Sequence, residues 1–123
     1  MITTAGKNHI RDFLLNGSSS NFDGIAVGTD DTTAAITDTA LGTRVYGETT
    51  TKSYPTTTRA MFDMNFAAGD YPATGSVTLK EVGLFTSADG TSGTMLCRQV
   101  ITDTIKTTSI AYRVQYDINV VNV

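Results

Sequence analysis

The chain is poor in the residues that stabilise small secreted proteins or bind metal ions. Its 123 residues include one cysteine (Cys97), one histidine (His9), two prolines and no tryptophan. A single cysteine excludes an internal disulfide framework, and a single histidine excludes a metal site built from several histidines. We therefore interpret Cys97 as a small buried hydrophobe and His9 as a packing or solvated side chain.

Charge of either sign is also scarce. Charged residues make up 17% of the chain, the net charge is −3 and the isoelectric point is near 4.8. With no basic patch to neutralise phosphates, the composition argues against a nucleic-acid partner. No apolar run approaches the length of a membrane span, and the N-terminus lacks the features of a secretory signal. We expect synthesis in a cytoplasm and no membrane partner.

Motifs of known enzyme chemistry are missing as well. The sequence contains no phosphate-binding glycine loop, no nucleophile elbow and no Cys-x-x-Cys pair. Two glycine-containing loops, residues 28–33 and 87–93, carry aspartates but do not match the spacing of a calcium loop. We interpret both as surface turns, and we predict no enzymatic activity, no cofactor and no metal.

The chain is rich in threonine, and one segment has the periodicity of a helix. It contains 23 threonines, which favour strands because a β-branched side chain packs well on a pleated surface. One helix is predicted over residues 4–16, where Ile10, Phe13 and Leu14 repeat at helical spacing and Thr3 or Thr4 can cap the first turn. Residues 110–120 alternate apolar and polar side chains, as a strand does.

Short predicted strands follow the helix at hairpin-like spacing. This pattern predicts an all-β fold, an antiparallel and jelly-roll-like β-sandwich with one N-terminal helix. The length suits one hydrophobic core. We therefore expect a single domain over residues 1–123, with an N-terminal helical arm of about residues 1–17.

A carboxylate interrupts one predicted strand. In KEVGLF (80–85), Glu81 lies between apolar residues, and the hydrophobic pattern slips by one position at this point. Such a slip predicts a β-bulge or a strand covered on both faces, and Gly83 supports a bulge or a close backbone approach. We interpret Glu81 as a structural ion-pair partner of Arg98 across the hairpin, because no second acid or histidine accompanies it for catalysis.

Three segments carry a family resemblance. AGKNHIRDFLLNG (5–17) leads into FDGIAVGTDDT (22–32), DTALGTRVYGETT (38–50) follows, and EVGLF (81–85) precedes Leu96 and Arg98. Together they resemble small structural proteins of tailed bacteriophages. The EVGLF segment is similar to a stretch of phage tail-collar and fibre-attachment domains, and the chain as a whole resembles capsid cement, or decoration, proteins.

The resemblance implies a non-enzymatic virion protein, located in particles assembled in the host cytoplasm. Decoration proteins are small β-rich modules that sit, often as trimers, over junctions between capsid subunits. Because these 123 residues contain no fibre shaft, we favour decoration over a tail, neck or baseplate adaptor. The implied partners are the major capsid protein or tail proteins of the same virion, and a homo-oligomer, with a trimer favoured. A carbohydrate-binding host-attachment module remains the alternative from another class.

Contact surfaces are predicted where charge and terminal or loop position coincide, and where arginine can bridge subunits. The seven candidate interface residues are Ile2, Lys7, Arg11, Asp30, Asp31, Arg59 and Arg113.

Overall fold

The computed structural model describes residues 1–16, 21–56 and 58–120 of the chain. A helix, α1 (Thr4–Asn16), precedes the strands β1 (Gly24–Gly28), β2 (Arg44–Thr49), β3 (Thr51–Thr56), β4 (Arg59–Phe66), β5 (Ser76–Phe85), β6 (Met95–Thr107) and β7 (Tyr112–Asn119). They form a four-stranded sheet in the order β2-β1-β5-β6 and a three-stranded sheet in the order β3-β4-β7. Every neighbouring pair is antiparallel. The predicted all-β sandwich with one N-terminal helix is confirmed.

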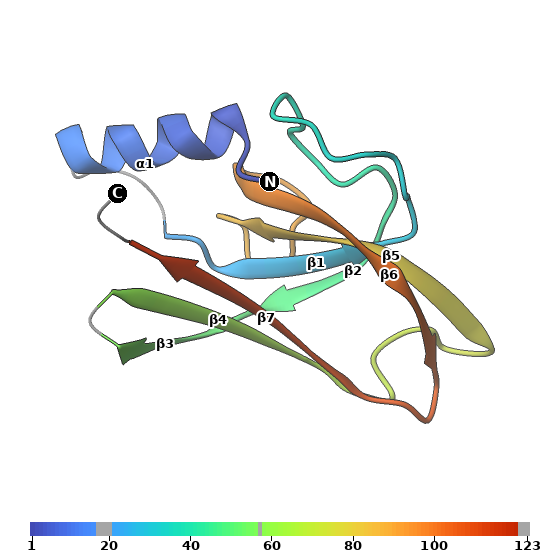
Figure 1. Ribbon diagram of the computed structural model, residues 1–123. Coiled ribbons are helices and arrows are strands. Elements are labelled where there is room, and N and C mark those ends of the chain that lie inside the picture. Colours follow the sequence, from blue (N-terminus) through green and yellow to red (C-terminus); the bar gives the residue numbers. More distant parts are fainter. Residues whose placement is uncertain (17–20, 57, 121–123) are drawn as a thin grey trace.

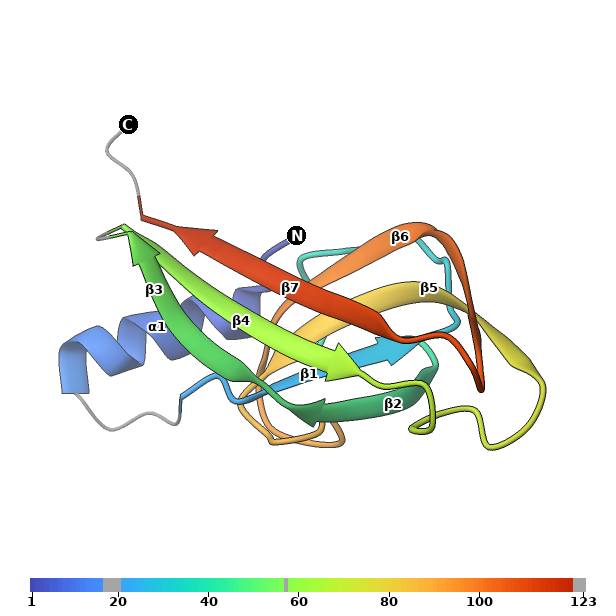
Figure 2. The ribbon, with the colours of Figure 1, turned by 90° about the horizontal axis from the view of Figure 1, so that it is seen from below.

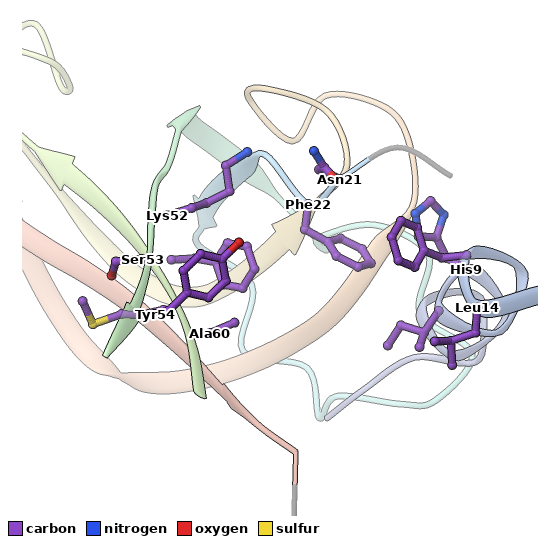
Figure 3. Close-up of a pocket in the computed structure, with 12 residues that line it drawn as sticks. His9, Leu14, Asn21, Phe22, Lys52, Ser53, Tyr54 and Ala60 are labelled. Atoms are coloured by element: carbon purple, nitrogen blue, oxygen red, sulfur yellow. The ribbon is translucent and has the colours of Figure 1, made fainter. Parts of the chain in front are cut away.

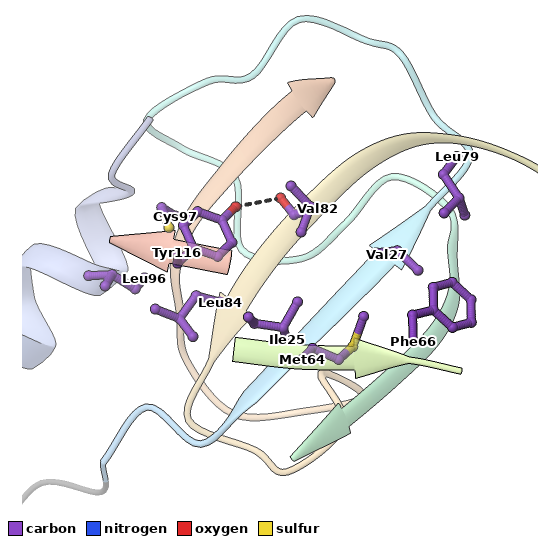
Figure 4. Close-up of a cluster of buried hydrophobic side chains, with 10 residues drawn as sticks. All are labelled: Ile25, Val27, Met64, Phe66, Leu79, Val82, Leu84, Leu96, Cys97 and Tyr116. Carbon is purple, nitrogen blue, oxygen red and sulfur yellow. Dashed lines mark hydrogen bonds between the residues drawn. The ribbon is translucent and has the colours of Figure 1, made fainter. Parts of the chain in front are cut away.

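The two sheets lie in two layers, and α1 lies at the end of the sandwich where β7 finishes (Figures 1 and 2). Apolar side chains of both inner faces fill the space between the sheets (Figure 4). In β4, Met64 and Phe66 are fully buried, because alternate residues of a strand point to one face. The core cluster comprises Ile25, Val27, Met64, Phe66, Leu79, Val82, Leu84, Leu96, Cys97 and Tyr116.

Strand β5 is covered on both faces, and its partner β6 contains a bulge. Between the pairs Leu79↔Thr104 and Glu81↔Val100, the single residue Lys80 opposes residues 101–103 of β6. The hydrophobic slip in KEVGLF thus corresponds to a register shift, as expected, and the additional residues belong to the partner strand. On the outer face of the four-stranded sheet, Phe85 forms a second small cluster with Ala26, Leu41 and Met95.

The start of the helix is fixed by threonine and by a short extension of the sheet. Thr3 is the N-cap, since its hydroxyl oxygen accepts a hydrogen bond from the Gly6 amide at 3.0 Å. The Thr3 amide donates to the Leu96 carbonyl at 2.8 Å, and Ile2 bridges to Cys97. The first residues of the predicted arm are therefore paired with β6. Gly17 follows the last helical residue, where glycine commonly caps a helix, and it lies outside the described residues.

A buried hydrogen bond from a tyrosine hydroxyl links the two sheets. The Tyr116 hydroxyl of β7 donates to the Val82 carbonyl of β5 at 3.0 Å within the core (Figure 4). Burial also raises the pKa of Tyr116 far above the ordinary tyrosine value, so this group stays protonated and can donate. Tyr116 thus lies on the core face of β7, as the alternation predicted.

We expect Tyr116→Phe to lower the free energy of unfolding by about 1 kcal/mol, because one buried hydrogen bond is lost without a change in ring packing. Urea denaturation followed by circular dichroism measures the loss. Tyr112→Phe is the matched control, since the Tyr112 hydroxyl bonds the Ile105 carbonyl at the surface, where water can replace it. Equal losses in the two variants would contradict the inter-sheet role.

Candidate functional site

The Glu81 carboxylate is buried beneath the loop that joins β1 to β2. Its side chain is fully enclosed. Oε1 accepts a hydrogen bond from the Thr43 amide at 2.7 Å and a longer one from the Asp30 amide at 3.4 Å. Oε2 accepts from the Gly42 amide at 2.9 Å and from Arg98 Nε at 2.8 Å. The carboxylate is thereby saturated by donors of this chain.

Arg98 extends the same network further into the loop. Arg98 is 2% exposed, and its guanidinium donates through Nη1 to the Thr32 carbonyl at 2.8 Å. Ion pairs join it to Asp30 at 3.1 Å and to Asp38 at 3.4 Å. Burial alone would lower the pKa of Arg98, but the hydrogen bond and the charge of Glu81 outweigh it, and the pKa is raised. The ion pair expected between Glu81 and Arg98 is present.

Two glycines of the four-stranded sheet lie where a Cβ atom would collide with neighbouring atoms. A Cβ placed on Gly28 would lie 2.2 Å from Glu81 Oε1 and 2.3 Å from the Thr43 carbonyl oxygen. A Cβ on Gly83 would lie 2.8 Å from the Phe85 ring and 3.0 Å from Leu41. Gly83 therefore permits a close approach of side chains above β5, whereas the register shift occurs at Lys80.

We interpret the network as a structural element, because Glu81 is fully buried and its hydrogen bonds come from Arg98 and from backbone amides of this chain. We expect Glu81→Gln to lower the free energy of unfolding by about 3 kcal/mol, since a buried guanidinium loses the one fully buried carboxylate among its three partners. Urea unfolding measures this loss. Hydrogen exchange of the Gly42 and Thr43 amides should accelerate in the same variant.

Asp31→Asn is the control for that variant. Asp31 lies in the same loop and pairs with Lys80, but its side chain is well exposed. Because solvent-exposed ion pairs contribute little to stability, the control should unfold nearly as the parent does. A Glu81→Gln variant as stable as the control would contradict the structural role of Glu81.

A recess of about 420 Å³ opens between α1 and the β3–β4 hairpin. His9 and Leu14 of α1 lie on one side, Lys52 and Tyr54 of β3 lie on the other, and Phe22 lies between them (Figure 3). Phe13 of α1 and Met61 of β4 also line the recess. The lining is largely apolar, with His9, Lys52 and Ser53 as polar additions. We refer to this recess as the helix–hairpin groove.

Aromatic and aliphatic side chains at the groove are well exposed. Leu14 is 76% exposed and Tyr54 is 89% exposed. The His9 ring packs at a tilt against Phe22, with 5.0 Å between the ring centroids. Lys52 bonds Asp23, so its ammonium is held at the rim. An apolar groove with a few polar groups at its rim suits binding.

The predicted interface residues fall in different environments. Ile2, Lys7 and Arg11 are exposed on the N-terminal segment, and Arg11 bonds Asp12 and Asn8. Asp31 is exposed, whereas Asp30 differs from the expected exposed loop acid, because its carboxylate is drawn inward by Arg98.

The two arginines expected between subunits are both in the three-stranded sheet. Arg59 at the start of β4 is half-buried, and its Nε has no hydrogen-bond partner among the described residues. Arg113 of β7 is exposed and pairs with Asp63 of β4 at 2.8 Å. Among the described residues, no ion pair joins either arginine to Asp31 or to the N-terminal segment.

The sequence does not reveal the groove, because the spacing of Ile10, Phe13 and Leu14 predicts a helix and not which of its side chains stay exposed. One signal was available. Leu15 follows Leu14 directly, which makes the apolar stripe wider than the contact with β6 can cover. Tyr54 precedes Pro55 on an edge strand, and nothing in the sequence pairs it with the helix.

A buried lysine was also missed. Lys106 of β6 is fully enclosed, and its ammonium donates to the Thr107 carbonyl at 2.9 Å and to the Ala68 carbonyl at 3.2 Å. It lies 4.8 Å from the centroid of the Phe66 ring, close enough for a cation–π attraction. These contacts account for its burial without a carboxylate in direct contact.

Two further features bear on chemistry: the Cys97 thiol and the possible ligands of a metal ion. Burial raises the pKa of the Cys97 thiol, which disfavours the reactive thiolate. Among the residues that the structure describes, no group of three or more histidine, cysteine, aspartate or glutamate side chains is placed to hold a metal ion. Within the same residues, no helix has both the length and the apolar character needed to cross a membrane.

Comparisons with known proteins leave the family open. No protein-family model matches the chain, and a search of curated proteins finds no match.

Proposed function

We propose that the chain is a non-enzymatic structural protein of a tailed bacteriophage virion, where it decorates the capsid and stabilises contacts between capsid subunits. The observation that carries the docking role is the apolar surface of the helix–hairpin groove, with Phe13, Leu14 and Tyr54 exposed together. The one fully buried carboxylate of the chain's described core, Glu81, is occupied by internal bonds.

The groove has the composition of a protein-binding surface. Contiguous exposed apolar patches mark interaction sites, and aromatic residues are enriched at the centre of interfaces. The helix is held in place by the Thr3 cap and by the pairing of Ile2 with Cys97. A surface that is already ordered loses less conformational entropy on binding.

A decoration role needs no catalysis. A protein that binds the assembled lattice, and not its dissociated subunits, stabilises the lattice by mass action at every site it occupies. The preferred partner is the major capsid protein. A tail, neck or baseplate adaptor would use the same groove on a partner present in far fewer copies.

The copy number of the chain in purified virions tests this proposal. We expect quantitative mass spectrometry to give a ratio to the major capsid protein near one. A ratio lower by an order of magnitude or more would place the chain in the tail instead, and absence from particles would contradict a virion role.

Leu14→Asp tests the groove itself. The charge is placed at an exposed position, so the variant should fold as the parent does and be lost from virions. The control is Thr108→Asp, at an exposed turn between β6 and β7, which should be incorporated normally. Normal incorporation of Leu14→Asp would contradict docking through the groove.

Glycan binding is the second candidate function, and one observation favours it. Tyr54 is 89% exposed at the rim of the groove, beside the polar side chains of Lys52 and Ser53. A sugar ring can stack on such an aromatic face while its hydroxyls bond the rim. A glycan array with the parent chain and Tyr54→Ala separates the two functions: loss of a glycan signal in the variant supports attachment, and a blank array for the parent contradicts it.

A further inference from the structure

The two layers of the sandwich do not have the same number of strands. Four strands face three, and β6 extends past β7 when the molecule is seen from below (Figure 2). Within the described residues, β7 pairs with β4 on one side and with no strand on the other. The place beside β7, opposite β6, is therefore available to a further strand.

A recess behind this free edge reaches the core. It has a volume of about 400 Å³ and is lined by Val27, Leu79 and Val82 of the four-stranded sheet, with Ile101 of β6 and Val114 of β7. A further strand beside β7 would cover these apolar side chains, because its inward residues would lie over the recess.

The other three outer strands carry features that discourage pairing. Strand β2 has a register shift opposite Val27 and Gly28 of β1. Strand β3 contains Pro55 and a register shift between Ser53 and Thr56. Strand β6 is paired with Ile2 at Cys97 and has a register shift farther along. Proline, bulges and covered edges are the usual protections of sheet edges.

Strand β7 lacks such protection. It runs for eight residues in unbroken register with β4 and contains no proline and no lysine. Its outward side chains are Arg113, Gln115, Asp117 and Asn119, all exposed.

We propose that β7 pairs with the β7 of a second copy of this chain, antiparallel and centred on Gln115, so that the two three-stranded sheets become one six-stranded sheet. In this register Arg113 lies opposite Asp117 of the second copy, and the reverse pair forms at the other end. Opposite charges directly across an antiparallel pair are favourable. The strand is thus complementary to itself about a two-fold axis.

Neighbouring registers lack this complementarity. Side chains keep their faces only when the register changes by whole pleats. Centring the pair on Val114 places Arg113 opposite Gln115, and centring it on Tyr116 places Arg113 opposite Asn119. Only the Gln115 register pairs the strand's cation with its anion.

The present contacts of Arg113 fit this arrangement. Its Nε bonds Asp63 at 2.8 Å, which leaves other guanidinium N–H groups to donate to a second carboxylate. Asp117 accepts hydrogen bonds from the Gln115 amide of the same strand at 3.0 and 3.2 Å. Pairing would replace these exposed bonds with contacts across the axis.

This inference does not rest on the proposed virion function. Pairing of β7 needs only a second copy in solution, whereas the virion role is tested on particles. A two-fold pair also differs from the trimer that the family resemblance favours.

Cysteine cross-linking tests the register. Directly opposite residues of an antiparallel pair have Cα atoms about 4.5–5.5 Å apart, within the range of a disulfide. Gln115→Cys should therefore form a disulfide dimer under mild oxidation. Asn119→Cys, on the same face, would be about 27 Å from its copy at ~3.4 Å per residue and should remain monomeric on a non-reducing gel.

The parent chain is a second control, because its Cys97 is buried. Equal cross-linking of Gln115→Cys and Asn119→Cys, or none of Gln115→Cys, would overturn the proposed pairing.

Sedimentation equilibrium tests the association without cross-linking. The parent chain should show a monomer–dimer equilibrium, and Gln115→Lys should weaken it at least tenfold, since two ammonium groups would meet on the axis. The control Thr56→Lys, on exposed β3, should dimerise as the parent does. A parent chain that stays monomeric at millimolar concentration, or a Gln115→Lys variant that dimerises unchanged, would overturn the inference.

Discussion

The arrangement of the four-stranded sheet depends on one buried ion pair, between Glu81 of β5 and Arg98 of β6. Two charges removed from water are tolerated only when their remaining hydrogen-bonding capacity is filled. The loop between β1 and β2 fills it with the Gly42 and Thr43 amides and the Thr32 carbonyl. The loop must therefore close over the sheet, and the outer face of β5 becomes interior.

This closure makes the two sheets unequal. The four-stranded sheet is covered by the core on one side and by loops on the other, so that β1 is buried along its whole length. The three-stranded sheet has polar, exposed side chains on its outer face, as an antiparallel sheet with one face in water does. Surfaces suited to partners therefore lie on the three-stranded sheet and beside it, at the helix–hairpin groove and at the edge of β7.

The chain has few charged residues, and two of its cations, Arg98 and Lys106, are buried. Its internal cations are held by defined partners: Arg98 by carboxylates and a carbonyl, and Lys106 by two carbonyls and the Phe66 ring. Both cations are on β6, whose sequence alternation gives no hint that one charged side chain points inward beneath a loop and another toward an aromatic ring. Whether a long cationic side chain is buried depends on acceptors that distant segments supply.

The sequence by itself determined the helix over residues 4–16, the antiparallel all-β class and the partnership of Glu81 with Arg98, because each depends on local periodicity or on hairpin neighbours. The tertiary structure alone decided that Asp30 turns inward, that Phe13 and Tyr54 border one groove, and that β7 is left as a free edge. These features depend on contacts between segments far apart in the chain. Side-chain spacing within a segment carries no record of which strand becomes an edge or which face a loop will cover.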